Sequence, residues 1–223
     1  MQIRGVILDV DGTLIDSNDA HAHAWVEALA QGNHQVPFEQ VRRLIGMGSD
    51  NLLPNTIGVS RDTPEGKQLS QAWQEIFESR YLPDLQPFPQ TRELIQRIHE
   101  QGLKIVVATS GEASMMEALL KLAQVDEFIE SETSSKDAKN SKPDPDLIQA
   151  ALEKIGYHSD QVVMLGDTPY DIEAAAKAGV KTIALRCGGW QDSGLADALA
   201  IYDNPADLLA HYDSSPLGSA VAV

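Results

Sequence analysis

Short runs of apolar residues recur along this chain of 223 residues, and stretches with helical periodicity separate them. The first run, Ile3–Asp9, is nearly all apolar and stops at an acidic turn that contains glycine. Comparable runs occupy Leu103–Thr109, Gln161–Gly166 and Val180–Leu185, and a weaker one spans Glu127–Glu130. Strands without polar alternation are buried on both faces, which indicates a parallel sheet covered by helices on each side. We therefore expect an α/β protein with a doubly wound parallel sheet.

The stretches between these runs have helical patterns, and most of them are followed by glycine. They span Gln90–Gln101, Ala113–Ala123, Pro145–Ile155 and Tyr170–Ala178. Gly102, Gly156 and Gly179 stand where the first, third and fourth of these helices should end, and glycine is the favoured residue there. Each predicted helix thus connects one strand to the next.

The interval between the first two predicted strands is longer than one connection needs, because a right-handed crossover requires a single helix. It carries no strand signal but three helical patterns, at Asp19–Gln31, Phe38–Ile45 and Glu65–Tyr81. We expect residues 1–17 and 89–223 to form an α/β core and residues 18–88 an inserted helical domain. An insertion there would lie over the ligand crevice of an open sheet and act as a lid; a purely structural insert is the alternative.

Two aspartates follow the first predicted strand. Asp9 and Asp11 are two residues apart, so their carboxylates point the same way at the strand end, as ligands of a hard cation do. Gly12 lets the chain turn sharply between Asp11 and Thr13. Taken alone, such a pair is more commonly a polar turn with two solvated aspartates.

The second predicted strand ends in Thr109, Ser110 and Gly111, directly before a helix. Hydroxyl groups and free backbone N–H groups at such a place can hold a phosphate. By itself the pattern is most often a helix N-cap.

Two further motifs stand near strand ends. Lys142 precedes a helix opened by proline, in SKPDPD, and the run GDTPYD places Asp167 and Asp171 four residues apart at a helix start. An isolated lysine is usually a surface residue, and two acids at a helix start are usually explained by capping and the helix dipole. Together, however, the four motifs would be independent coincidences at the carboxyl ends of parallel strands, where such sheets bind ligands. A functional site is therefore the favoured interpretation.

The four motifs, in order, resemble those of the haloacid dehalogenase-like hydrolase superfamily: DVDGTL, VVATS, SKPDPD and GDTPYD. The resemblance covers nearly the whole chain. The insert between the first two motifs resembles the α-helical cap of the branch that contains phosphoglycolate phosphatases and β-phosphoglucomutases. The resemblance implies a Rossmann-like sheet with strand order 5-4-1-2-3, in which the first strand lies between the second and the fourth.

The resemblance also implies a mechanism. Asp9 would attack phosphorus and form an aspartyl-phosphate, and Asp11 would act first as general acid and then as general base. Mg²⁺ would be held by Asp9, the main-chain carbonyl of Asp11 and Asp167. Lys142 would offset charge where nucleophile and phosphate meet. Asp171 would orient this lysine, Gly12 and Thr13 would support the catalytic turn, and Thr109, Ser110 and Gly111 would hold phosphate oxygens.

The predicted cap carries two further candidates for substrate binding. His21 matches the position of a histidine that lies near the nucleophile in some mutase-like relatives, and a structural histidine is the alternative. Arg43 precedes a glycine-containing stretch that resembles the substrate-specificity loop of such caps, and a solvent-facing basic pair is the alternative. The sequence assigns no role to His23. Lys67 lies well after the Schiff-base lysine position of phosphonate-cleaving relatives, which argues against that chemistry.

The composition limits the partners. Formal net charge is −16, from 33 acidic and 17 basic residues, which argues against nucleic acid or an anionic membrane surface. The sequence has no stretch of membrane-spanning length and no signal-peptide pattern at its start. Cys187 is the only cysteine and lies in no catalytic-cysteine signature, so it is expected to be structural and the chain to work in a reducing cytoplasm. We expect a monomer or a homodimer.

Three functions compete at this stage. The first is a Mg²⁺-dependent phosphatase acting on a small phosphorylated metabolite, such as phosphoglycolate or a sugar phosphate. The second is a sugar phosphomutase that uses the same aspartate but keeps water away from the intermediate. The third is a non-catalytic binding module with this fold, which the full set of chemical positions disfavours. Asp11 argues against dehalogenation, because halide release needs no acid.

Overall fold

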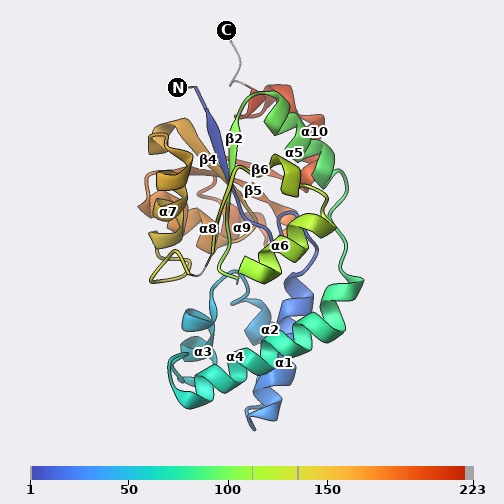
Figure 1. Cartoon of the computed structure of the whole chain (residues 1–223), viewed down its shortest axis with the longest axis vertical. Coiled ribbons are helices and arrows are strands. Elements are labelled where there is room, and N and C mark those ends of the chain that lie inside the picture. The colour runs from blue at the N-terminus through green and yellow to red at the C-terminus, as the bar shows by residue number, and fades with distance from the viewer. Residues whose placement is uncertain (1, 112, 135, 219–223) are drawn as a thin grey trace. The chain divides into compact units, whose positions relative to one another are not determined.

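A parallel sheet of six strands is the central feature of the computed structural model, which describes residues 2–111, 113–134 and 136–218 (Figure 1). The strands are β1 Gly5–Leu8, β2 Lys104–Ala108, β3 Ser131–Thr133, β4 Val162–Gly166, β5 Lys181–Leu185 and β6 Ala200–Tyr202. They lie in the order β3-β2-β1-β4-β5-β6, and every pairing is parallel. The predicted α/β class is confirmed, and the predicted order reappears with β6 added beyond β5.

The sequence did not predict the two short edge strands, β3 and β6, correctly. The third strand is Ser131–Thr133 and not Glu127–Glu130, because Asp126–Phe128 forms a turn of 3-10 helix before the chain enters the sheet. The residues Ser-Glu-Thr carry almost no apolar signal, and β6 is equally short. Edge strands of three residues are buried too little to produce the continuous apolar run that identifies central strands.

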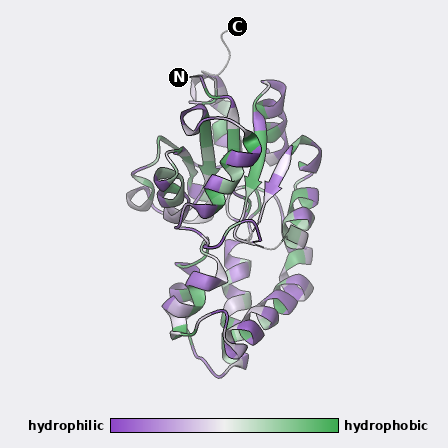
Figure 2. Cartoon of the chain, turned by 60° about the vertical axis from the view of Figure 1, so that its left-hand side comes forward, coloured by the Kyte–Doolittle hydropathy of each residue, from purple (hydrophilic) through white to green (hydrophobic). Residues whose placement is uncertain are grey.

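Helices cover both faces of this sheet. They are α5 Thr91–Glu100, α6 Ala113–Leu122, α7 Asp146–Ile155, α8 Pro169–Lys177, α9 Asp192–Leu195 and α10 Pro205–Ala210. Figure 1 shows α7 and α8 on one face and α5, α6 and α10 on the other. Most of the strands are largely hydrophobic in Figure 2, because helices cover them on each side. The edge strand β3 differs, since it consists of the polar residues Ser-Glu-Thr. Leu147 and Ile148 of α7 pack with Ile7 and Met164 in one continuous core.

The chain divides into two compact units. One, here called the core unit, consists of Met1–Asp16 and Gln86–Val223 and contains the sheet; the other, the helical unit, is Ser17–Leu85. The helical unit contains α1 Asn18–Gln31, α2 Phe38–Arg42, α3 Ser49–Ile57 and α4 Pro64–Ile76, which continues into a π-helical turn, Phe77–Tyr81. Among the described residues, no helix is long and apolar enough to cross a bilayer.

The helical unit has a hydrophobic core of its own, in which Trp25 and Trp73 stack with ring centroids 5.1 Å apart. Two helices differ from the prediction. The second ends at Arg42 and not at Ile45, and the chain then turns through Gly46, whose φ is 105°. The helix α3 was not predicted, because Pro54 lies inside it and interrupts the helical pattern.

Candidate active site

Three strand ends that carry predicted site residues lie next to one another. Because β1 lies between β2 and β4, the residues that follow these strands meet at the carboxyl edge of the sheet. Asp9 follows β1, and its backbone N–H donates to the Leu165 carbonyl oxygen at 2.9 Å. Thr109 follows β2 and Asp167 follows β4. All three of these side chains are buried.

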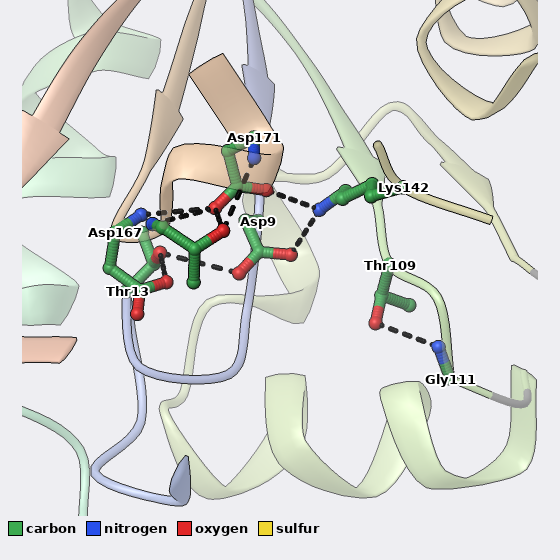
Figure 3. A network of polar contacts seen from close by, with 8 residues as sticks. Asp9, Thr13, Thr109, Gly111, Lys142, Asp167 and Asp171 are labelled. Carbon is green, nitrogen blue, oxygen red and sulfur yellow. Dashed lines mark hydrogen bonds and ion pairs between the residues drawn. The ribbon is translucent and has the colours of Figure 1, made fainter. Parts of the chain in front are cut away.

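Lys142 joins this group from the segment before α7. Its ammonium lies 2.6 Å from Asp9 Oδ1 and 2.7 Å from Asp171 Oδ1, and only 1% of its side chain is exposed. Figure 3 shows the lysine between the two carboxylates. A lysine is rarely buried unless it is paired. The surface position that an isolated lysine would suggest is therefore wrong for Lys142.

Asp171 is anchored by the first turn of α8. Its Oδ2 accepts hydrogen bonds from the backbone N–H of Asp167 at 3.2 Å, from the backbone N–H of Thr168 at 3.0 Å and from the Thr168 hydroxyl at 2.7 Å. Thr168 in turn caps the helix by accepting from the Asp171 N–H, and Pro169 occupies the first helical position. The capping box thus fixes the carboxylate that holds Lys142, so capping and site support are performed by the same residues.

The turn after β1 brings Thr13 close to the carboxylates of Asp9 and Asp167. Gly12 has φ 75°, a conformation that glycine adopts without strain, and its N–H donates to the Ile15 carbonyl at 2.8 Å. The Thr13 hydroxyl then lies 3.0 Å from Asp167 Oδ1 and 3.4 Å from Asp9 Oδ2 (Figure 3). Asp11 lies in the same turn and is half-buried.

The charges of this cluster do not balance. Burial raises the pKa of Asp9 to about 7, and the nearby Asp171 and Asp11 carboxylates add to the rise, although the charge of Lys142 opposes it. Burial also acts to lower the pKa of Lys142, but the charges of Asp171 and Asp9 outweigh it and hold that pKa above its usual range. Lys142 therefore stays charged, whereas its single positive charge does not fully offset the cost of burying a negative charge on Asp9.

The donor set fits a hard divalent cation. One carboxylate oxygen from each of Asp9, Asp167 and Asp171 lies within 4.8 Å of the others. Lys142 is the only lysine or arginine among the buried side chains in the described part of the chain, and buried charges are normally paired or bind metal. Both oxygens of Asp171 are already bonded, to Lys142 and to the α8 cap. The remaining carboxylate oxygens, those of Asp9 and Asp167, are of the kind that Mg²⁺ prefers.

The loop after β2 presents the predicted phosphate-binding groups. The Thr109 hydroxyl is buried and accepts a hydrogen bond from the Gly111 N–H at 3.1 Å. The Ser110 hydroxyl is shielded from solvent and has no hydrogen-bond partner among the described residues. A buried hydroxyl without a partner is costly, and a phosphate oxygen would satisfy it.

Three other residues singled out in the sequence have different settings. His21 is buried inside the helical unit, where its ring stacks on Phe77 with centroids 3.9 Å apart. Arg43 directly follows α2 in the same unit. The predicted contacts of His21 and Arg43 with substrate stay predictions. Cys187 donates its thiol to the Gly12 carbonyl at 3.4 Å, and burial raises its pKa, which agrees with the structural role expected from the sequence.

Sequence reasoning overlooked Thr168 as a site residue. Its hydroxyl both donates to Asp171 and accepts from the Asp171 N–H, so it fixes the carboxylate that holds Lys142. The signal was present, because a threonine followed three residues later by an acid at a helix start is the pattern of a capping box.

Comparisons with known proteins cover almost the whole chain. A family model described as haloacid dehalogenase-like hydrolase matches residues 6–185. Pyrophosphatase PpaX of Bacillus mycoides is 27% identical over 218 residues, which are 94% of this chain and 96% of that protein. Phosphoglycolate phosphatase of Caulobacter vibrioides is 29% identical over 187 residues, 82% of this chain and 79% of that protein. The crystal structure of a hydrolase from Pseudomonas syringae has a TM-score of 0.88 and 32% identity, and covers 95% of this chain and 98% of that one.

Proposed function

Because the chain belongs to the haloacid dehalogenase-like hydrolase family, we propose that it is a Mg²⁺-dependent phosphatase that carries a phosphoryl group on Asp9. One observation supports this proposal above the others: the ammonium of Lys142 is buried between Asp9 and Asp171, at 2.6 Å and 2.7 Å. A buried cation held beside a carboxylate suits the transfer of an anionic group.

In the first half-reaction, a carboxylate oxygen of Asp9 attacks phosphorus, and the bond from phosphorus to the ester oxygen breaks. The leaving oxygen takes its proton from Asp11. In the second half-reaction, a water molecule attacks phosphorus and gives a proton to Asp11, while the bond between phosphorus and Asp9 breaks. Inorganic phosphate is released, and both aspartates return to their starting states.

The other residues position and neutralise. Lys142 offsets the negative charge that builds up where Asp9 meets the phosphoryl group, and Asp171 keeps the lysine in place. The hydroxyl groups of Thr109 and Ser110 would donate hydrogen bonds to the phosphate oxygens. Mg²⁺ bound by Asp9, Asp167 and the Asp11 carbonyl would supply further charge stabilisation for the phosphoryl oxygens.

The names of two relatives support the proposed substrate class. A pyrophosphatase and a phosphoglycolate phosphatase are both similar to this chain, and both names denote small phosphorylated substrates. We extend this class to the present protein, as a small phosphorylated metabolite of the phosphoglycolate or sugar phosphate type. The formal charge of −16 would repel such an anion, so local cations such as Lys142 have to attract it. A cytoplasmic location is part of the proposal and rests on the single cysteine.

The proposal is tested by phosphate release from phosphoglycolate, pyrophosphate, sugar phosphates and nucleotides, with and without Mg²⁺. Asp9→Asn should lose at least about a thousandfold in rate, whereas Asp213→Asn, at an aspartate whose side chain is 88% exposed, should keep full activity. When wild-type protein is quenched with acid during turnover of a substrate, mass spectrometry should find phosphate on Asp9. Full activity of Asp9→Asn would reject the mechanism. Conversion of a sugar 1-phosphate to its 6-phosphate without phosphate release would assign the mutase function instead.

A further inference from the structure

A glycine that the mechanism does not use lies directly against the carboxylate of Asp167. After β5 the chain forms a turn of 3-10 helix, Arg186–Gly188, which comes back over the end of β4. A Cβ atom built on Gly188 would overlap Oδ2 and Cγ of Asp167, and even the Cβ of Asp167 would be only 2.5 Å away. Ordinary van der Waals contact between carbon atoms begins at about 3.5 Å.

The Asp167 side chain has no room to move away. It is fully buried, and its Oδ1 accepts from the Thr13 hydroxyl at 3.0 Å. Its backbone N–H donates to Asp171, and the next residue, Thr168, caps α8. A rotation of the carboxylate would break the contact with Thr13 and change the position of the oxygens that face Asp9.

The Arg186–Gly188 turn is also held in place. Arg186 makes ion pairs with Asp192 and Asp203, both at 2.6 Å. The Cys187 thiol donates to the carbonyl of Gly12 in the catalytic turn at 3.4 Å. A side chain at position 188 would therefore push against Asp167 from a segment that is fixed on both sides.

Space is the reason for glycine at this position. The backbone of Gly188 does not have a positive φ, whereas its neighbour Gly189 has φ 93°. An alanine at position 188 can thus adopt the backbone conformation, and its effect reports the contact with Asp167 alone.

We propose that Gly188 is a positioning residue, which sets the orientation of the Asp167 carboxylate and through it the affinity of the site for Mg²⁺. This inference rests on the proposed function, because that function assigns Asp167 to the metal. Gly188 touches neither the substrate nor the reacting atoms in this proposal. It acts by leaving free the volume that the Asp167 carboxylate occupies against Thr13.

The steric part is tested in metal-free protein, without substrate. Gly188→Ala should lower the folding equilibrium constant at least tenfold in the wild-type background, and less than threefold in an Asp167→Gly background, where the obstructing side chain is gone. Gly194→Ala is the matched control: its new Cβ would face the Trp190 ring at 3.1 Å, so its effect should be equal in both backgrounds. Equal effects of Gly188→Ala in both backgrounds would overturn the proposal. So would failure of the double variant to fold when Asp167→Gly folds.

The metal part is measured by titration calorimetry with Mg²⁺. Gly188→Ala should raise the Mg²⁺ dissociation constant about tenfold or more, a size typical of residues that orient a metal ligand, while Gly194→Ala should leave it unchanged. The lost phosphatase activity of Gly188→Ala should return at high Mg²⁺ concentration. An unchanged dissociation constant would overturn the proposal. If wild-type protein binds no Mg²⁺ but the stability coupling to Asp167 is found, the metal assignment fails and the steric role of Gly188 stands.

Discussion

The two units of the chain use their interiors in opposite ways. The core unit buries charge: Lys142, Asp167 and Asp171 each expose 1% or less of the residue surface. The helical unit buries rings and aliphatic side chains, and its ion pairs, such as Arg80 with Glu27, lie at the surface. Each arrangement has a different energetic consequence.

Packed rings remove apolar area from water and stabilise a fold directly. A buried ion pair has to repay the desolvation of both partners, so it is weak evidence for stability and persists for another reason. In the core unit that reason is the chemistry proposed for Asp9. The comparison therefore predicts that substitutions in the core unit depend on pH and metal, whereas those in the helical unit depend on packing.

The largest effect is expected for Lys142→Met, which keeps most of the side-chain volume but removes the charge. Asp9 and Asp171 would then be buried without a counter-charge, so the free energy of unfolding should fall by about 3–5 kcal/mol. The loss should be larger at pH 8 than at pH 5, because protonation of the carboxylates relieves it. Urea denaturation at both values measures this. Lys154→Met is the matched control: it removes a half-exposed pair with Asp137 at 2.8 Å and should cost less than about 1 kcal/mol.

The next effect is the pH dependence of the metal-free protein. The pKa of Asp9 is raised to about 7 by burial, and an unfolded aspartate titrates near 3.9. Between these values the folded state holds the extra proton, so this contribution to stability is full below pH 4 and is lost as pH rises through about 7. The slope is at most about 1.4 kcal/mol per pH unit.

Comparison with Asp9→Asn isolates this slope, because the amide cannot titrate. The difference in unfolding free energy between the two proteins in EDTA should change between pH 4 and pH 7 and then level off. Asp213→Asn, at an exposed carboxylate, should follow the wild type throughout. A difference that stays constant over this range would contradict the raised pKa of Asp9.

In the helical unit, Phe77→Leu should cost about 1–2 kcal/mol of unfolding free energy. Phe77 is fully buried, and leucine retains apolar bulk but loses the ring that stacks on His21 at 3.9 Å. The loss should depend on pH far less than that of Lys142→Met, because the substitution removes no charge. Phe38→Leu is the control, because Phe38 is only half-buried against His23 and should lose less. A pH dependence as strong as that of Lys142→Met would remove the distinction between the two units.

The site in the core unit could be predicted from the sequence in part. Parallel strands bring their carboxyl ends to one edge, so Asp9, Thr109 and Asp167 could be grouped from strand positions alone. Lys142 follows no strand directly, and only its motif suggested that it belongs to the group.

What could not be predicted depends on contacts between distant parts of the chain. The requirement for glycine at position 188 follows from the return of one loop over the end of another strand, which leaves no local pattern. The helix α3 was hidden by Pro54, and β3 by a sequence of three polar residues. In the helical unit, packing of His21 on Phe77 uses residue types that are also typical of a ligand site, so pattern alone left both interpretations of His21 open.

The smallest effect is expected for the surface ion pairs of the helical unit. Arg80 lies 2.5 Å from Glu27, but its side chain is 62% exposed, so water and salt screen the pair. Arg80→Ala should therefore lower the free energy of unfolding by less than about 1 kcal/mol, and 0.5 M NaCl should abolish most of that loss. Lys142→Met serves as the reference, because its buried pairs are shielded from salt and its cost should persist. A salt-resistant loss above about 2 kcal/mol at Arg80 would mean that this pair is more shielded than its exposure implies, and that charge contributes to stability in both units.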